Sequence, residues 1–283
     1  MKNIVIDTSS FFVTLKCNLR CKHCCTGTPY AKGAAHFPLK HLKDSVSRYF
    51  EIIKFIRKFS LTGGEPFLRL DLHELIEEVL QYSNQFDVFE IVTNGTIMPN
   101  DGTIDAISKK ADKTYVMIDR YGKLSEKADE LYELLKSSGV RCHIREYGDT
   151  DAYSGGWVDL GAYSEKHNSK NAEKLFKMCN IVNKKKTNTA TDGTYDYEND
   201  FLIVYCTMYN GQLHYCGRSA ATLRHLNIDK DSDYVEVTNQ SIGIEELRNK
   251  IIKMYTSQTP FACAYCNGEL DDSPRVVPAQ QMP

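Results

Sequence analysis

The sequence predicts an α/β fold built on a parallel sheet that is either open or closed toward a barrel. Strand-like and helix-like segments alternate up to about residue 146. In the later units one strand–helix pair follows another every ~25–30 residues, a spacing typical of βαβ connections. The chain of 283 residues is 42% hydrophobic and 25% charged, which is the composition of a globular protein with a sizeable core.

Hydrophobic periodicity and end signals define the elements of this alternation. The first helix is amphipathic, with its apolar side chains recurring on one face. The last helix of the series has Ser125 as its expected N-cap and Gly139 just past its end. We expect strands at residues 10–16, 59–62, 87–93, 114–119 and 140–146, and helices at 39–58, 72–83 and 125–139. Ligands of such folds gather at the C-terminal ends of the strands.

The alternation stops between residues 147 and 200, where the chain is polar, poorly periodic and rich in Thr, Asn and Asp. We interpret this stretch as a loop, and as a plain insertion rather than a lid over a site. Asn210-Gly211 then separates two strand-like runs and predicts a hairpin. A helix at about 244–256 and a Pro-rich, extended tail complete the chain. The expected division is therefore 1–150, a variable loop at 151–200, a second unit at 201–270 and a tail at 271–283.

Charge and apolar runs exclude several classes of partner. The net charge is −2, so nothing predicts binding to nucleic acid or to an anionic membrane surface. The N-terminus has no signal-peptide pattern and no apolar run reaches membrane-spanning length, which predicts a cytoplasmic protein. The cytosol keeps thiols reduced, so the ten cysteines favour metal binding or catalysis over disulfides.

Four cysteines lie close together after the first predicted strand. Cys17, Cys21 and Cys24 have the spacing CxxxCxxC, and Cys25 follows directly. Three thiolates on one short loop can hold three corners of a cubic iron–sulfur cluster and leave the fourth iron open. Structural zinc fits this spacing poorly, because it usually takes two widely separated pairs of ligands.

These cysteines, together with the segment "LTGGEP" at 61–66, resemble the radical S-adenosylmethionine (SAM) enzymes. The resemblance covers roughly residues 8–150 and implies a partial (β/α) TIM-like barrel of the radical SAM type. It implies a [4Fe-4S] cluster on Cys17, Cys21 and Cys24 that binds SAM. In the family, the residues matching Glu65 hold the amino group of SAM, those matching Asp119 a ribose hydroxyl and those matching Arg145 the SAM carboxylate. The resemblance implies these cofactor-binding residues: His23, Gly63, Gly64, Glu65, Pro66, Thr93, Asn94, Asp119 and Arg145.

The same resemblance implies the chemistry. One electron, supplied by a reductase or flavodoxin-type donor, cleaves SAM to methionine and a 5′-deoxyadenosyl radical, which takes a hydrogen atom from substrate. Cys25 is either a small buried residue or a hydrogen-atom donor near the site, and Cys142 is a second candidate donor that also fits a core position.

A second group of cysteines lies toward the C-terminus. Cys206 and Cys216 bracket the predicted hairpin, and Cys263 and Cys266 form a CxxC pair. From chemistry alone zinc and iron–sulfur compete equally. The segment resembles the auxiliary-cluster appendage of radical SAM enzymes, the short "twitch" form of the SPASM domain, which implies a second [4Fe-4S] cluster.

The fourth ligand of this second site has two candidates. A two-residue Asn-Gly turn pairs Cys206 with Tyr215 and points it away from Cys216, unless a bulge restores them to one face. Cys179 is far upstream, at a distance that an insertion would explain. We expect Cys206 rather than Cys179.

The layout is similar to that of twitch enzymes that oxidise or epimerise carbohydrates and aminocyclitols, so a sugar-like small molecule is the expected substrate. Two alternatives remain. A peptide maturase forming a thioether, C–C or epimerised linkage is disfavoured because only sixteen residues precede Cys17, too few for a leader-binding domain. A zinc-stabilised binding module without catalysis would be colourless.

Overall fold

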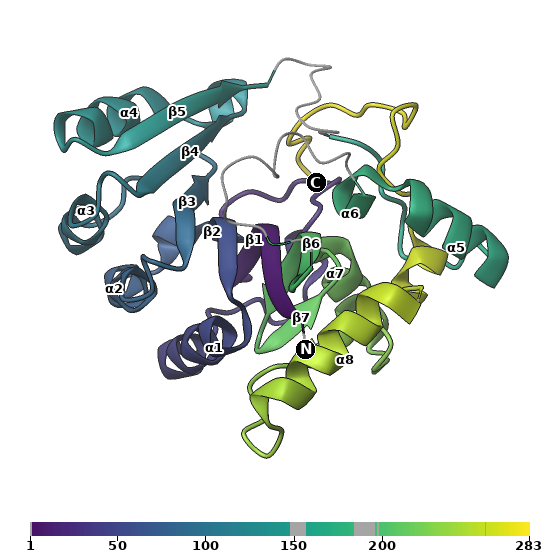
Figure 1. Ribbon diagram of the computed structural model, residues 1–283. Coiled ribbons are helices and arrows are strands. Elements are labelled where there is room, and N and C mark those ends of the chain that lie inside the picture. The colour runs from purple at the N-terminus through teal and green to yellow at the C-terminus, as the bar shows by residue number, and fades with distance from the viewer. Residues whose placement is uncertain (1, 148–156, 184–195, 197, 258) are drawn as a thin grey trace.

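The computed structural model describes residues 2–147, 157–183, 196, 198–257 and 259–283. One eight-stranded sheet organises them, in the order β5-β4-β3-β2-β1-β6-β7-β8. The strands from β5 to β6 are parallel, and the last two pairings are antiparallel. This strand order confirms the α/β class and the parallel sheet. The sheet is open and does not close into a barrel (Figure 1). The strands are β1 (Asn3–Thr14), β2 (Phe55–Gly63), β3 (Phe86–Thr93), β4 (Thr114–Arg120), β5 (Arg141–Glu146), β6 (Asp200–Tyr209), β7 (Gln212–His214) and β8 (Tyr234–Glu236).

Helices α1 to α4 follow the order of the strands along one side of the sheet (Figure 1). Their apolar faces and the strand residues beneath them form one continuous core. The helices are α1 (Leu39–Ile52), α2 (Leu72–Leu80), α3 (Asp101–Ser108), α4 (Ala128–Ser137), α5 (Ser169–Met178), α6 (Asn180–Asn183), α7 (Gly217–Leu226) and α8 (Ile244–Ser257). Among the described residues, no helix is long and apolar enough to cross a membrane.

All five strands expected in the first half are present, but β1 begins at Asn3 instead of residue 10 and β2 at Phe55 instead of residue 59. The helices differ in three details. The helix expected at 39–58 ends at Ile52, because Ile53 turns to extended backbone and β2 begins two residues later. Helix α3 was not expected. Ser125 is not the N-cap of α4; its hydroxyl donates to backbone oxygens of Asn94 and Asp119 at 2.6 and 3.1 Å.

The expectation of a structureless loop between 147 and 200 is wrong for α5 and α6. Helix α5 begins after Asn168, whose side chain accepts a hydrogen bond from the amide of Asn171 and acts as an N-cap. The rest of the loop prediction falls largely on 148–156 and 184–195, which lie outside the described residues.

The predicted hairpin is confirmed. Asn210 and Gly211 both have positive φ, 48° and 84°, as a tight two-residue turn requires. However, β6 also pairs with β1 in parallel, so the C-terminal segment continues the same sheet instead of forming a separate one. The division of the chain into domains remains a prediction.

Candidate functional site

A cavity of about 520 Å³ lies on the face of the sheet opposite α1 to α4. Its strand residues, such as Ser10, Ser60 and Glu90, alternate with core residues such as Phe59 and Phe89. The ends of β4 and β5 and part of the cysteine loop complete the wall. This size suits a small-molecule ligand.

The three-cysteine loop leaves the C-terminal end of β1, as predicted. Hydrogen-bond donors reach its sulfurs: the amide of Leu19 lies 3.4 Å from Cys17 Sγ, and Asn94 Nδ2 lies 3.7 Å from the same atom. The side chain of Gln281 donates to Cys21 Sγ at 3.4 Å. Burial raises the pKa of Cys17 to about 11 and of Cys21 to about 12. Without a metal these thiols are protonated, and hydrogen-bond donors lie around them. This suits a metal centre, because a bound metal ion displaces the thiol protons and its positive charge stabilises the thiolates.

The C-terminal tail covers this loop. Residue Cys21 forms an isolated β-bridge with Gln281, and Ala279 is buried against Leu19 and Cys21. The tail forms isolated bridges at Arg275 and Gln281 and turns at Ala279, whose φ is 51°, and it closes the outer side of the cysteine loop.

Gly63 and Gly64 admit the backbone of the cysteine loop to the end of β2. A Cβ on Gly64 would lie 2.0 Å from the carbonyl oxygen of Lys16, and one on Gly63 would lie 2.4 Å from that of Thr14. The amides of Gly64 and Glu65 donate to these two oxygens at 2.8 Å. Only glycine allows this approach, so the two glycines fix the loop on the sheet.

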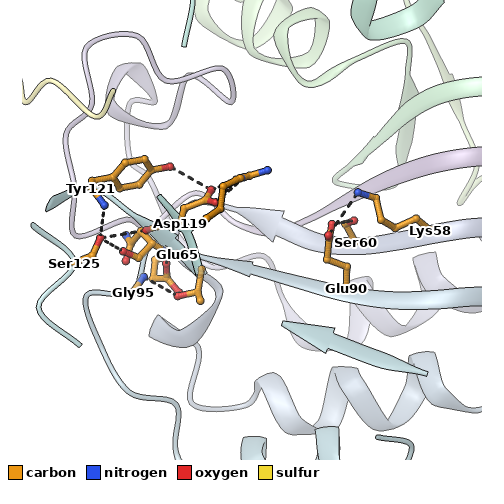
Figure 2. A network of polar contacts seen from close by, with 11 residues as sticks. Lys58, Ser60, Glu65, Glu90, Gly95, Asp119, Tyr121 and Ser125 are labelled. Carbon is orange, nitrogen blue, oxygen red and sulfur yellow. Dashed lines mark hydrogen bonds and ion pairs between the residues drawn. The ribbon is translucent and has the colours of Figure 1, made fainter. Parts of the chain in front are cut away.

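Glu65 is fully buried and joins the ends of β2 and β3. Its carboxylate accepts from Phe67 N at 3.0 Å, Thr93 Oγ1 at 2.8 Å and Asn94 N at 2.8 Å. Burial raises its pKa to about 7, against the opposing effect of these donors. A carboxylate offers about four acceptor positions, so one remains for an ammonium group. Figure 2 shows this network beside that of Asp119, Tyr121 and Ser125.

Asp119 and Arg145 bind each other. Arg145 donates from Nε to Asp119 Oδ1 at 2.7 Å and from Nη2 to Oδ2 at 2.8 Å, a bidentate pair at the cavity wall. Burial lowers the pKa of Arg145, but Asp119 outweighs this and the net direction is upward. The sequence predicted separate roles for these residues, whereas the structure makes them one ion pair.

Cys25 and His23 line the cavity, and Cys142 does not. The Cys25 side chain is accessible from the cavity, while the surrounding protein raises the pKa of its thiol to about 12. Cys142 Sγ instead faces the carbonyl oxygen of Tyr132 on α4 at 3.8 Å, which places it on the helix side of the sheet. Of the two candidate donors, only Cys25 lies where a substrate would bind.

Residues 11–148 match the model of the radical SAM superfamily. These residues form a radical SAM domain. Among curated proteins, the chain is 29% identical over 102 residues to the GTP 3′,8-cyclase of Campylobacter lari and 33% identical over 100 residues to that of Helicobacter pylori. These matches cover 33% and 34% of this chain and only 29% and 30% of the relatives.

The solved structure of BtrN in complex with AdoMet and 2-DOIA shares the fold. The TM-score is 0.54, the identity is 13%, and the match covers 93% of each chain. The radical SAM family implies SAM bound to a [4Fe-4S] cluster. Within the radical SAM domain, the CxxxCxxC loop, the glycine pair and the Asp119–Arg145 pair lie at the same edge of the sheet.

Outside the radical SAM domain, a second pocket brings four cysteines together. They are Cys179, Cys216, Cys263 and Cys266. Cys179 caps the end of α5, Cys216 caps the start of α7, and the CxxC pair lies in a 3₁₀ turn at Phe261–Tyr265 and just after it. Burial raises the pKa of all four thiols.

The expectation that Cys206 belongs with them has to be corrected. Cys206 is fully buried on the other face of β6, 3.1 Å from the Tyr49 hydroxyl and 3.5 Å from Ser9 Oγ. The tight Asn-Gly turn leaves no bulge, so Cys206 and Cys216 stay on opposite faces.

Among the described residues, no three His, Cys, Asp or Glu side chains converge on a point that a single metal ion would occupy. Tetrahedral zinc would hold its thiolates about 3.8 Å apart, whereas an iron–sulfur cluster is larger and holds them farther apart.

The two pockets share a wall of Leu160, Ile181, Arg218 and Glu269. Arg218 is buried, donates to the carbonyl oxygen of Gly161 at 2.6 Å and lies over the ring of Tyr163. Neither Arg218 nor Glu269 was predicted. Their signal was their position in sequence, because Arg218 lies two residues after Cys216 and Glu269 three residues after Cys266.

The polar cavity floor was also missed. Ser60 and Glu90 lie on strands that the sequence located, whereas Lys58, which was expected at the end of a helix, also belongs to β2. Parallel strands covered on both faces are usually apolar throughout, so polar residues at alternate positions of such a strand indicate a cavity.

Proposed function

We propose that this protein is a radical SAM enzyme that removes a hydrogen atom from a polyhydroxylated small molecule, and so oxidises or epimerises it. The observation that carries the proposal is the 520 Å³ cavity, which joins the cysteine-loop residues His23 and Cys25 to a polar strand face. When bound, SAM and its cluster supply a 5′-deoxyadenosyl radical. The remaining steps depend on side chains of this chain.

Three groups of residues support cofactor binding. Cys17, Cys21 and Cys24 hold the cluster, and amide donors from Asn94 and Gln281 stabilise the negative charge on the sulfurs. Gly63 and Gly64 position the loop. Glu65 offers its remaining acceptor position to the amino group of SAM, and the Asp119–Arg145 pair offers both a carboxylate and a guanidinium at the cavity wall.

The second pocket supports an auxiliary [4Fe-4S] cluster on Cys179, Cys216, Cys263 and Cys266. Four thiols enclosed by protein are the ligand set of a closed cluster or of zinc. The shared wall between this pocket and the cavity favours a cluster, because an electron acceptor next to the substrate would complete an oxidation. Epimerisation would instead use the Cys25 thiol to return a hydrogen atom to the substrate radical.

The name of the curated relatives raises GTP as an alternative substrate, and the charges of the cavity argue against it. A triphosphate needs several cations that have no other partner. Among the described lining residues, the acids Asp7, Glu90, Asp119 and Glu269 face Lys58, Arg145 and Arg218. The two strand cations, Lys58 and Arg145, each pair with a carboxylate. A neutral or weakly charged substrate suits this balance better.

The test is to count iron and sulfide in anaerobically reconstituted protein and to assay 5′-deoxyadenosine after adding SAM and dithionite. Wild type should hold about eight irons and a Cys17/Cys21/Cys24→Ala variant about four. Only wild type should form 5′-deoxyadenosine.

Cys179→Ala and Cys206→Ala form a matched pair for the second cluster. Cys179→Ala should lose about four irons and Cys206→Ala none. Zinc in place of iron in the second pocket would remove the auxiliary cluster from the proposal. Absence of 5′-deoxyadenosine from fully loaded wild type would overturn the proposed function.

A further inference from the structure

The polar floor of the cavity is built from neighbouring residues of β2 and β3. Ser60 pairs in register with Glu90, and Lys58 lies two residues earlier on the same face of β2. Ser60 Oγ donates to Glu90 Oε2 at 2.5 Å, and Lys58 Nζ lies 3.5 Å from Glu90 Oε1. Figure 2 shows this group apart from the Glu65 and Asp119 networks.

A buried carboxylate in the middle of a parallel sheet needs a reason. Glu90 is only 6% exposed, and burying a charge is costly unless it is well paired. Its ion pair with Lys58 is long, and the Lys58 side chain remains 42% exposed. The carboxylate has about four acceptor positions and the ammonium group three donors, so this contact and the Ser60 bond leave capacity on both.

From this arrangement we infer that Lys58, Ser60 and Glu90 form the substrate-recognition subsite, and that it binds two adjacent hydroxyl groups of an uncharged polyol. A hydroxyl both donates and accepts, so it can donate to Glu90 while accepting from Lys58. The opposite charges largely cancel, which disfavours phosphorylated and other strongly charged ligands. This inference rests on the proposed function and names its substrate class.

The neighbouring strands extend the same surface. Ser10 pairs in register with Ser60, and its hydroxyl lies 2.7 Å from that of Tyr205 on β6. Both line the cavity. Four strands therefore contribute hydroxyl or charged groups to one floor, as recognition of several hydroxyls requires.

The distance between this floor and the cofactor residues also suits a small polyol. Glu90 lies three residues before Thr93, which binds Glu65 at the strand end, so it is about 10 Å from the edge where the cofactor residues lie. A six-membered ring held at Glu90 would turn its opposite side toward Cys25 and the cysteine loop. The subsite then selects the substrate and sets which carbon faces the radical.

The inference is tested by binding, measured without turnover. Reconstituted wild type is titrated calorimetrically, in the absence of reductant, with myo-inositol, scyllo-inositol, glucose and galactose, and with glucose 6-phosphate as the charged probe. Glu90→Gln and Lys58→Met should each weaken binding of the best neutral polyol about tenfold. The matched control is Glu77→Gln and Lys109→Met, an exposed ion pair on the helix side, which should leave binding unchanged.

Formation of 5′-deoxyadenosine without substrate separates this inference from the proposed function. It should be equal in wild type and in the two control variants, because the exposed Glu77–Lys109 pair does not line the cavity. Its absence from wild type would overturn the proposed function. If wild type forms it, the inference alone fails when no neutral polyol binds, when glucose 6-phosphate binds best, or when the subsite variants bind like the controls. If Glu90→Gln does not fold, Lys58→Met carries the test, because Lys58 is partly exposed.

Discussion

The two cysteine sites of this protein are built in opposite ways. The first takes its three cysteines from eight consecutive positions of one loop, 17–24, and opens toward the cavity through the adjoining Cys25. The second collects four cysteines from three separate segments and encloses them beside that cavity. A local motif carries its own geometry, whereas a site assembled from distant segments depends on the whole fold. The difference also suits the proposed roles, since a reactive centre needs an open position and an electron acceptor does not.

The largest expected effect separates the roles of the two sites. Cys17→Ala should lower formation of 5′-deoxyadenosine by more than 100-fold, since even residues that only support a ligand are worth 10–100-fold. Cys263→Ala should retain substrate-free SAM cleavage within about twofold while abolishing oxidised product. Chromatographic assay of 5′-deoxyadenosine and product measures both. Equal loss of SAM cleavage in the two variants would contradict the separation of roles.

The sequence anticipated the first site better than the second, because only the first is formed by a local motif. The spacing of Cys17, Cys21 and Cys24 predicted a site within one loop, and the structure places the glycine pair at the end of β2 beside that loop. The second site required knowing that α5 brings Cys179 to the CxxC turn, and α5 lies in a segment whose polarity concealed its helix. The Asn-Gly turn did predict that Cys206 is not a ligand, because a two-residue turn without a bulge points Cys206 away from Cys216.

Fold prediction followed a similar division. Each of the five early strands was located from its apolar run, since a strand with a buried face needs apolar residues within its own few positions. The parallel pairing of β6 with β1 joins residues about 200 apart in the chain and leaves no local signal. The same applies to the Asp119–Arg145 pair, whose members were identified singly but not as partners.

Gly64→Ala should destabilise the protein by about 3 kcal/mol. The new Cβ would meet a backbone oxygen at 2.0 Å, so the cysteine loop would have to move. Gly243→Ala is the matched control, with open space around the added methyl and no positive φ, and should stay within about 0.5 kcal/mol. Thermal unfolding of the cluster-free proteins measures both. A Gly64→Ala protein as stable as the control would mean that the loop is not held at this point.

The buried carboxylate of Glu65 makes a prediction about pH. Its pKa is raised from 4.5 to about 7, so between these values the folded protein binds more protons at this group than the unfolded chain does. The stabilising contribution of Glu65 is therefore full below pH 4.5 and is lost as the pH rises through 7. The loss is about 3 kcal/mol.

Denaturant unfolding of cluster-free wild type and Glu65→Gln at pH 4.5 and 7.5 tests this. The quantity compared is the change with pH in the stability difference between wild type and variant. Other titrating groups contribute equally to both proteins and cancel. His214, for example, has the opposite trend, because burial lowers its pKa to about 3. Wild type should lose stability relative to the variant as the pH rises. Parallel pH profiles would show that Glu65 titrates as an ordinary carboxyl.

The smallest effect concerns the tail that covers the first site. Gln281→Ala removes the amide that donates to Cys21 Sγ and to the carbonyl oxygen of Ala279, and one acceptor for the amide of Arg20. Loss of such an outer hydrogen bond should speed release of iron from the first cluster to a chelator about tenfold. Gln280→Ala is the control, because Gln280 contacts Lys22 through its backbone oxygen. The iron of the second cluster should be released at the wild-type rate in both variants, since Gln281 donates to Cys21 of the first site and does not line the second pocket. Faster release from both clusters would mean that the tail stabilises the whole fold and has no particular role at the open site.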